Sequence, residues 1–200
     1  LDDYSLLRHL GEAYAEADAH VFPTRPALAY FERTPIALAE RAFQGSDYFI
    51  APNPDFGATF TWHLKESLST ARDRRREAEM ETAEEGGDVY YPTWEELKAE
   101  DREPDPAIWL TVRDADGTIV THLRGATSAG IHRTSWDLTV PGFAPVGAGG
   151  FGGGGYMVAP GAYTVEVNRW YEGAMTRLSE PVEFEVEALR REGVEAADWA

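Results

Sequence analysis

The sequence predicts a mainly β protein, an antiparallel β-sandwich with a charged α-helical insertion at about 66–105, after the first strand. Apolar and polar residues alternate with period 2 in several short segments, most clearly in 56–64 and 108–113. Turn signals such as Asp-Ala-Asp-Gly at 114–117 separate these segments. Between the first two lies a stretch rich in Ala, Arg and Glu whose charges recur at helical spacing. Short alternating segments divided by turns are typical of a sandwich and not of a βαβ fold.

Composition excludes several functional classes. The 200 residues include 35 acidic and 18 basic side chains, for a formal charge of −17, whereas proteins that bind nucleic-acid phosphates are usually basic. There is no cysteine, which excludes disulfides, cysteine nucleophiles and thiolate metal sites. No run approaches the ~20 consecutive apolar residues of a membrane-spanning helix. We therefore expect neither a nucleic-acid partner nor membrane insertion.

The chain is expected to divide into three parts. Segment 1–46 is irregular and punctuated by prolines, and we interpret it as the end of a preceding domain followed by a linker. The β domain then spans 47–188, and 189–200 is expected to start a C-terminal helical extension. Because the sequence opens on Leu1 without a signal peptide, we expect it to belong to a longer protein.

The first strand of the β domain is expected at 56–64, where five apolar residues share one face. Later strands are expected at 108–113, 119–123, 130–138, 163–167 and 182–186, and Glu172-Gly173 turns the chain toward 175–178. A loop at 141–155 carries seven glycines between Val146 and Gly155. The side chains predicted to form the core are Phe56, Phe60, Trp62, Leu110, Val112, Trp136, Tyr163, Val165 and Phe184.

Two helices are expected in the insertion. The first covers 67–85 and ends at Gly86-Gly87, a common helix terminator. The second begins at Thr93, since Thr93 and Glu96 have the spacing of a capping box. The segment 66–105 holds 14 acidic and 6 basic side chains, so we expect a solvated, projecting arm in which Arg75 and Glu79 pair at i, i+4. Trp94 and Trp109 are expected to pack between this arm and the sheet.

Several motifs together resemble known families. Residues 107–168 resemble the Ig-like fold of the flagellar hook-capping type, on the hairpin at Asp114–Gly117, Gly130-Ile131-His132, Trp136-Asp137 and Pro160-Gly161-Ala162-Tyr163. Nearly the whole chain resembles the region C-terminal to the β-propeller in large bacterial proteins with sortilin-like, BNR-type (Asp-box) repeats, often labelled glycosyl-hydrolase-like. The motifs that carry this resemblance are Leu1-Asp2-Asp3, Ala51–Ala58, Leu64-Lys65, Tyr91–Leu97, Glu100-Asp101-Arg102, Leu110–Asp114, His132-Arg133 and Trp136-Asp137-Leu138.

The resemblance implies a function without catalysis for this chain. The propeller would hold any catalytic site, and this chain would be an accessory Ig-like module that packs on the propeller and braces it. It also implies an extracellular or periplasmic location. An alternative is that the chain contributes a loop, such as Gly147–Gly155, to the active site of a hydrolase formed by the full-length protein.

Motifs for catalysis, cofactors and metals are incomplete, so we expect none of these. Gly147–Gly152 satisfies G-x-G-x-x-G, but more glycine follows where a dinucleotide site needs a helix. Asp114–Gly117 resembles the start of a calcium loop, yet the twelfth position is Gly125 instead of Glu. No histidine pair has metal-ligand spacing, and there is no G-x-S-x-G motif.

Aromatic residues form the candidate interaction surface. Exposed Trp109, Trp170 or Tyr171 would stack on sugar rings if the chain were a carbohydrate-binding module, which makes polysaccharide a second candidate partner. Phe151 and Tyr156 flank the glycine-rich segment and are candidates for a contact tip.

Overall fold

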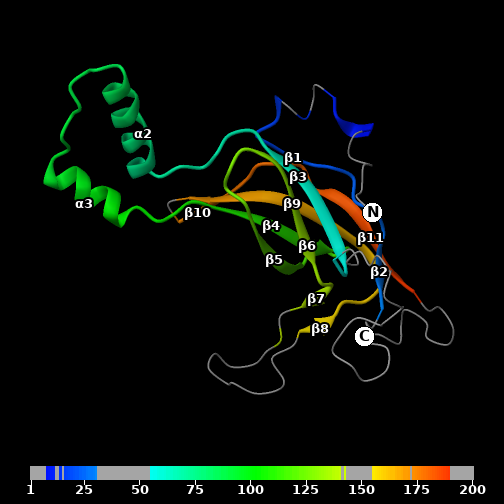
Figure 1. The fold of residues 1–200 in the computed structure, drawn as a ribbon. Coiled ribbons are helices and arrows are strands. Elements are labelled where there is room, and N and C mark those ends of the chain that lie inside the picture. The colour runs from blue at the N-terminus through cyan, green and yellow to red at the C-terminus, as the bar shows by residue number, and fades with distance from the viewer. Residues whose placement is uncertain are drawn as a thin grey trace, which may run out of the picture.

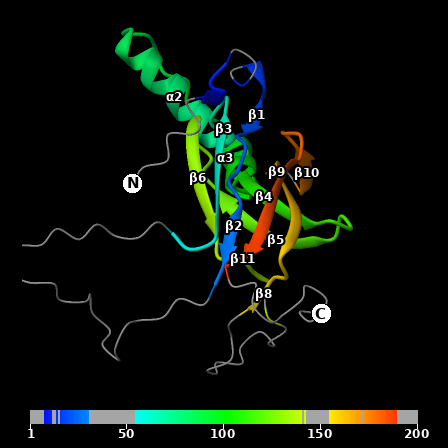
Figure 2. The same ribbon diagram turned by 90° about the vertical axis from the view of Figure 1, so that its right-hand side faces the viewer.

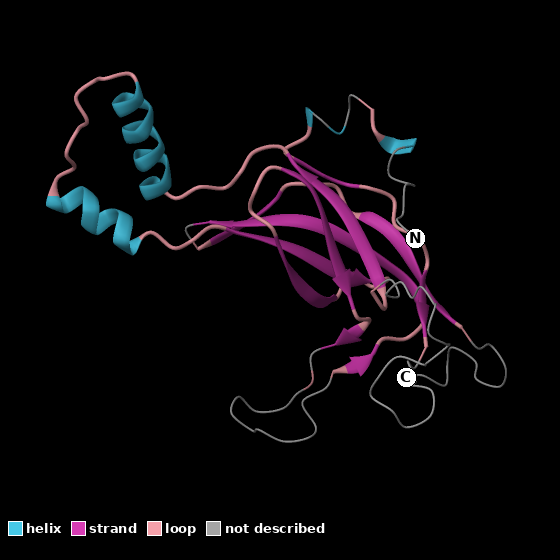
Figure 3. Ribbon diagram, viewed as in Figure 1, coloured by secondary structure: helices cyan, strands magenta, loops and turns pink. Residues whose placement is uncertain are grey.

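The computed structural model is mainly β, with curled multi-stranded sheets and two helices at one end (Figure 1, Figure 3). It describes residues 8–11, 14, 16–30, 55–140, 142, 155–171 and 173–189. All but the first residue of the C-terminal extension expected at 189–200, the interior of the glycine-rich loop and Phe151 lie outside these ranges.

The smaller sheet has three antiparallel strands in the order β1 (Ala19–Val21), β3 (Ala58–Leu64) and β6 (Gly130–Trp136). Along β3 buried residues alternate with exposed or half-buried ones, as expected, and the apolar side chains of Ala58, Phe60, Trp62 and Leu64 are all buried. Gly57 immediately before β3 has φ +100°, and a Cβ there would lie 1.9 Å from the carbonyl oxygen of Trp136. Glycine is therefore required where the chain enters this strand.

The larger sheet is built around the long strand β9 (Gly161–Tyr171). One edge of β9 pairs with β4 (Ala107–Asp114), which in turn pairs with β5 (Ile119–Gly125). The other edge pairs with β11 (Val182–Ala188) and, further along, with β10 (Ala174–Arg177). β2 (Ala27–Ala29) completes the sheet beside β11, and a separate ribbon joins β7 (Thr139–Val140) to β8 (Tyr156–Met157).

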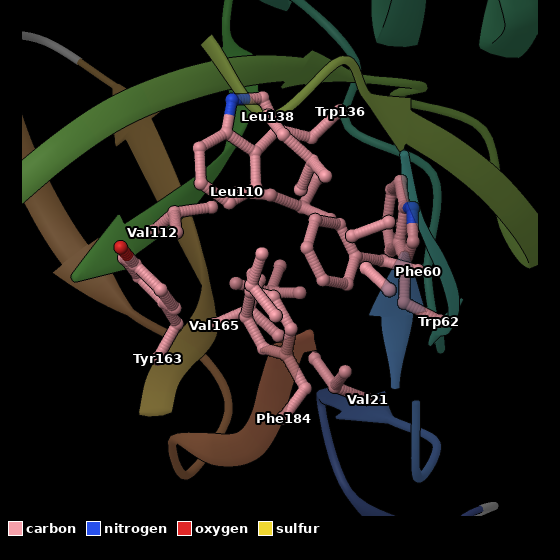
Figure 4. Close-up of a cluster of buried hydrophobic side chains, with 14 of the residues drawn as sticks. Val21, Phe60, Trp62, Leu110, Val112, Trp136, Leu138, Tyr163, Val165 and Phe184 are labelled. Atoms are coloured by element: carbon pink, nitrogen blue, oxygen red, sulfur yellow. The ribbon is translucent and has the colours of Figure 1, made fainter. Parts of the chain in front are cut away.

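The two sheets share one hydrophobic core (Figure 4). Phe60 of β3 meets Phe184 of β11 with ring centroids 5.0 Å apart, and Trp136 of β6 meets Tyr163 of β9 at 5.9 Å. Of the nine side chains predicted for the core, eight are buried and Phe56 is partly buried against them. Period-2 alternation identified these positions because one face of each strand must leave water.

The N-terminal segment differs from the expected linker in its described part. β1 pairs with β3 in the smaller sheet, whereas β2 pairs with β11 in the larger sheet. Phe22, between them, is 1% exposed. The domain boundary expected at residue 46 therefore does not separate this segment from the sheets, because strands on its N-terminal side belong to both of them. β2 is also parallel to β11, so the larger sheet is not purely antiparallel. β1 and β2 have only three residues each, too few to show alternation.

The two helices form an arm, defined here as residues 71–102, that extends away from the sheets (Figure 1, Figure 2). α2 spans Ala71–Glu84 and α3 spans Trp94–Arg102, and neither buries a residue. The capping box at Thr93 and Glu96 is present as predicted, and a second one joins Thr70 and Asp73 at the start of α2. Each box satisfies backbone N–H groups that would otherwise lack acceptors.

Candidate functional site

The first candidate surface is the outer face of β4, β5 and β9, here called the outer platform. Its residues alternate along each strand with those that face the hydrophobic core, so they point away from that core. In the strand register Trp109 lies opposite Asn168, and Thr111 lies opposite Glu166. The platform comprises Trp109, Thr111, Arg113, His122, Glu166, Asn168 and Trp170.

A polar network lies at the centre of the platform. Asn168 Nδ2 donates to Thr111 Oγ1 at 2.9 Å and to Glu166 Oε1 at 3.3 Å. His122 Nδ1 lies 3.1 Å from Thr111 Oγ1, and Arg113 Nη2 donates to Glu166 Oε1 at 3.4 Å. Thr111, Glu166 and Asn168 are all buried although they face outward. Neighbouring side chains cover them, and their mutual hydrogen bonds offset the cost of removing polar groups from water.

The two tryptophans of the platform are diagonal neighbours. Trp109 is paired with Asn168, and Trp170 stands two residues further along β9 on the same face. Diagonal neighbours on one face lie within reach of large side chains. Both indoles are half-buried, and the ring of Trp109 meets that of His122 edge-on at 6.4 Å. The platform thus combines aromatic surface with fixed hydrogen-bonding groups.

The second candidate surface is the arm tip, defined as Val89, Tyr90, Tyr91 and Trp94. Their exposed fractions are 46%, 63%, 87% and 66%. Trp94, expected to lean on the sheet, instead faces solvent with the ammonium group of Lys98 5.3 Å from its ring centre. Neither helix of the arm buries a residue, so Trp94 remains uncovered.

Ion pairs clamp the two helices of the arm together. Arg75 binds Glu100 of α3 in a bidentate pair at 2.6 and 2.8 Å and also pairs with Glu79 at 2.6 Å, as predicted. Arg72 pairs with Asp101. Hydrogen bonding to Glu100, and then to Glu79, raises the pKa of Arg75 above its usual value, and the hydrogen bonds from Arg75 lower the pKa of Glu100. A bidentate pair fixes the relative orientation of its two partners. The Arg75–Glu100 pair therefore holds α2 and α3, which carry the arm tip, in one arrangement.

Glu103 joins the arm to the larger sheet. Its carboxylate accepts from Tyr171 Oη of β9 and from the backbone N–H of Ala71, both at 2.6 Å. These hydrogen bonds, that of Tyr171 foremost, lower the pKa of Glu103. The carboxylate also lies at the N-terminus of α2, where negative charge is favoured. One residue therefore connects the end of α3, the start of α2 and the end of β9.

The structure brings together only part of the predicted interaction surface. Trp109 and Trp170 share the platform, whereas Tyr171 faces the other way and is half-buried beside Glu103. Tyr156 lies on β8 and is 69% exposed, and Phe151 is outside the described residues. The prediction missed the arm tip, although the sequence shows Tyr90, Tyr91 and Trp94 clustered at the Thr93 capping box.

The described residues offer no metal site. They contain no group of three or more His, Asp or Glu side chains arranged to hold a metal ion. His20 and His63 lie opposite each other on β1 and β3, and burial together with His63 lowers the pKa of His20. The Asp114 carboxylate accepts from the backbone N–H groups of Asp116 and Thr118, so the hairpin turn predicted at 114–117 accounts for this acidic motif.

The comparisons with known proteins do not identify a family. No family model, curated protein or solved structure matches the chain. Within the part of the chain that the structure describes, no helix has both the length and the apolar character to cross a membrane.

Proposed function

We propose that the chain is a non-catalytic accessory module with an Ig-like β-sandwich, which packs on a neighbouring domain of a longer protein. Two sheets that enclose one core through contacts such as Phe60–Phe184 support the sandwich. The resemblance of the sequence motifs to regions that follow a bacterial β-propeller supports that propeller as the neighbour. The same resemblance supports an extracellular or periplasmic location.

The observation that carries this proposal is the exposed arm tip. Clustered exposed aromatic residues on a folded protein mark sites of contact with other macromolecules. Aromatic residues also dominate the energetics of protein interfaces. The Arg75–Glu100 clamp holds the helices before any contact forms, which lowers the ordering cost of binding. A rigid support with aromatic side chains at its end suits a bracing contact between domains.

The experiment compares the isolated chain with the longer protein that contains it. Hydroxyl-radical footprinting should show Tyr90, Tyr91 and Trp94 protected in the longer protein and reactive in the isolated chain. Replacing these three residues together by alanine should restore reactivity of the propeller surface and increase the radius of gyration. Tyr156→Ala, also at an exposed aromatic side chain, is the matched control. Equal labelling of the tip in both proteins would overturn the proposal.

A second candidate function is carbohydrate binding by the outer platform. Trp109 and Trp170, diagonal neighbours on one face of the platform, offer aromatic surface on which sugar rings can stack. Tryptophan fluorescence should then change when soluble polysaccharides are added to the wild-type chain. The change should be lost in Trp109→Ala and Trp170→Ala and kept in Trp94→Ala. The absence of any change across a polysaccharide panel would exclude this function.

A further inference from the structure

A cavity of about 470 Å³ lies where the arm joins the sheets. Its walls come from the end of β3, the connecting segment 65–69, the first turn of α2, the end of β9 and the residue after β10. The cavity is therefore separate from the outer platform and from the arm tip. Its volume lies in the range of sites for small organic ligands, about 300–1,000 Å³.

Three basic side chains line this cavity: Lys65, Arg74 and Arg169. Lys65 Nζ donates to the carbonyl oxygen of Glu16 at 3.3 Å, and Arg74 Nη1 donates to that of Ser69 at 2.8 Å. Among the described residues none of the three forms an ion pair, whereas Arg72 and Arg75 on the same helix both do. In a chain of charge −17, basic groups that converge without carboxylate partners indicate a place for an external anion.

Carboxylates are nevertheless present around the cavity. Asp18 and Glu66 line it, so the local excess of positive charge is small. Glu103 is close enough to Arg74 for that charge to contribute to its lowered pKa, but its oxygens are held by Tyr171 Oη and by the backbone of Ala71. The guanidinium groups of Arg74 and Arg169 therefore retain N–H donors that are not hydrogen-bonded to these carboxylates.

Arg169 provides the second observation. It follows Val165 and Val167 on the inner face of β9, so its side chain enters the cavity instead of the platform. Its Nε is buried and has no hydrogen-bond partner. Buried polar atoms are nearly always paired, and a charged donor without an acceptor is costly. The structure thus contains a cavity with an unmet donor and apolar walls from Leu64, Leu68 and Leu178.

We propose that this cavity binds a small organic carboxylate, whose oxygens pair with Arg169 and Arg74 and whose apolar part rests on the leucine wall. The planar guanidinium matches a carboxylate in a bidentate pair, which a lysine ammonium does not. This proposal is independent of the proposed bracing function, because neither the arm tip nor the platform lines the cavity.

Benzoate and its neutral analogue benzamide form a matched pair of probes for titration of the full chain. Benzoate should shift the Arg169 Nε–H resonance in ¹⁵N–¹H spectra and bind saturably, and benzamide should do neither. Since hydrogen bonds to charged groups are the strong ones, Arg169→Gln and Arg74→Gln should each weaken benzoate binding by about tenfold or more. Arg72→Gln, on an ion-paired residue, should leave it unchanged.

The outcomes separate the alternatives. If Arg169→Gln does not fold, Arg74→Gln still tests the proposal, because Arg74 is an exposed side chain on the arm and its replacement should not prevent folding. Trp109→Ala should bind benzoate as the wild type does, which distinguishes the cavity from the platform. Equal binding of benzamide, equal weakening by Arg72→Gln, or no saturable binding at millimolar benzoate would each overturn the proposal.

Discussion

Replacing Phe60 and Phe184 by leucine, singly and together, should reveal an energetic coupling between the two sheets. Phe60 is 0% exposed and Phe184 is 5% exposed, and their rings meet at 5.0 Å and 71°. Each replacement removes three carbons, so at ~0.8 kcal/mol per buried methylene each single variant should lose about 2 kcal/mol. An edge-to-face ring pair contributes roughly 0.5–1.5 kcal/mol beyond its buried area. The double variant should therefore lose less than the sum of the singles by about that amount.

Urea denaturation, followed by far-ultraviolet circular dichroism, measures the four free energies of unfolding. A parallel cycle with Phe60→Leu and Tyr91→Ala is the control, because Tyr91 is 87% exposed on the arm tip. Distant substitutions usually add within about 0.3–0.5 kcal/mol. Additivity in the Phe60–Phe184 cycle as well would refute direct packing of the two sheets through these rings.

Three further results are expected. Gly125→Ala should destabilise the chain by about 1–3 kcal/mol through overpacking, since the new Cβ would lie 2.7 Å from Trp62 Cζ2; unchanged urea stability would contradict this. Asn168→Ala should lower the free energy of unfolding by about 1–3 kcal/mol, because Thr111 and Glu166 lose a hydrogen-bond partner. A melting temperature equal to that of the wild type would argue against the network. The hydrogen bonds from Arg75 lower the pKa of Glu100, so their contribution to the stability of the arm should be complete at pH values above 4.5, the ordinary pKa of a glutamate. That contribution should be lost as the pH falls through the lowered pKa of Glu100. ¹⁵N–¹H spectra should then show α2 and α3 separating in acid while the sheets persist, and the same acid transition in Glu100→Gln would contradict this assignment.

Local patterns were sufficient to predict much of the fold and part of the arm. The alternation in β3 identified its buried face, and the Asp114–Gly117 turn and the Thr93 capping box were both confirmed. These features form through interactions between residues a few positions apart, so they can be predicted from a short stretch of sequence. The Arg75–Glu79 pair was predictable for the same reason, because i, i+4 residues lie on one helix face.

Contacts between distant segments were decided only by the tertiary structure. The sequence alone established the acidic composition, the buried face of strands such as β3 and the helix cap at Thr93. The assignment of β1 and β2 to different sheets depends on partners more than 40 and 150 residues away. The Asn168–Thr111 bond and the approach of Lys65, Arg74 and Arg169 to one cavity likewise join separate elements. Such arrangements arise from strand register and the closure of two sheets over one core, which no local pattern encodes.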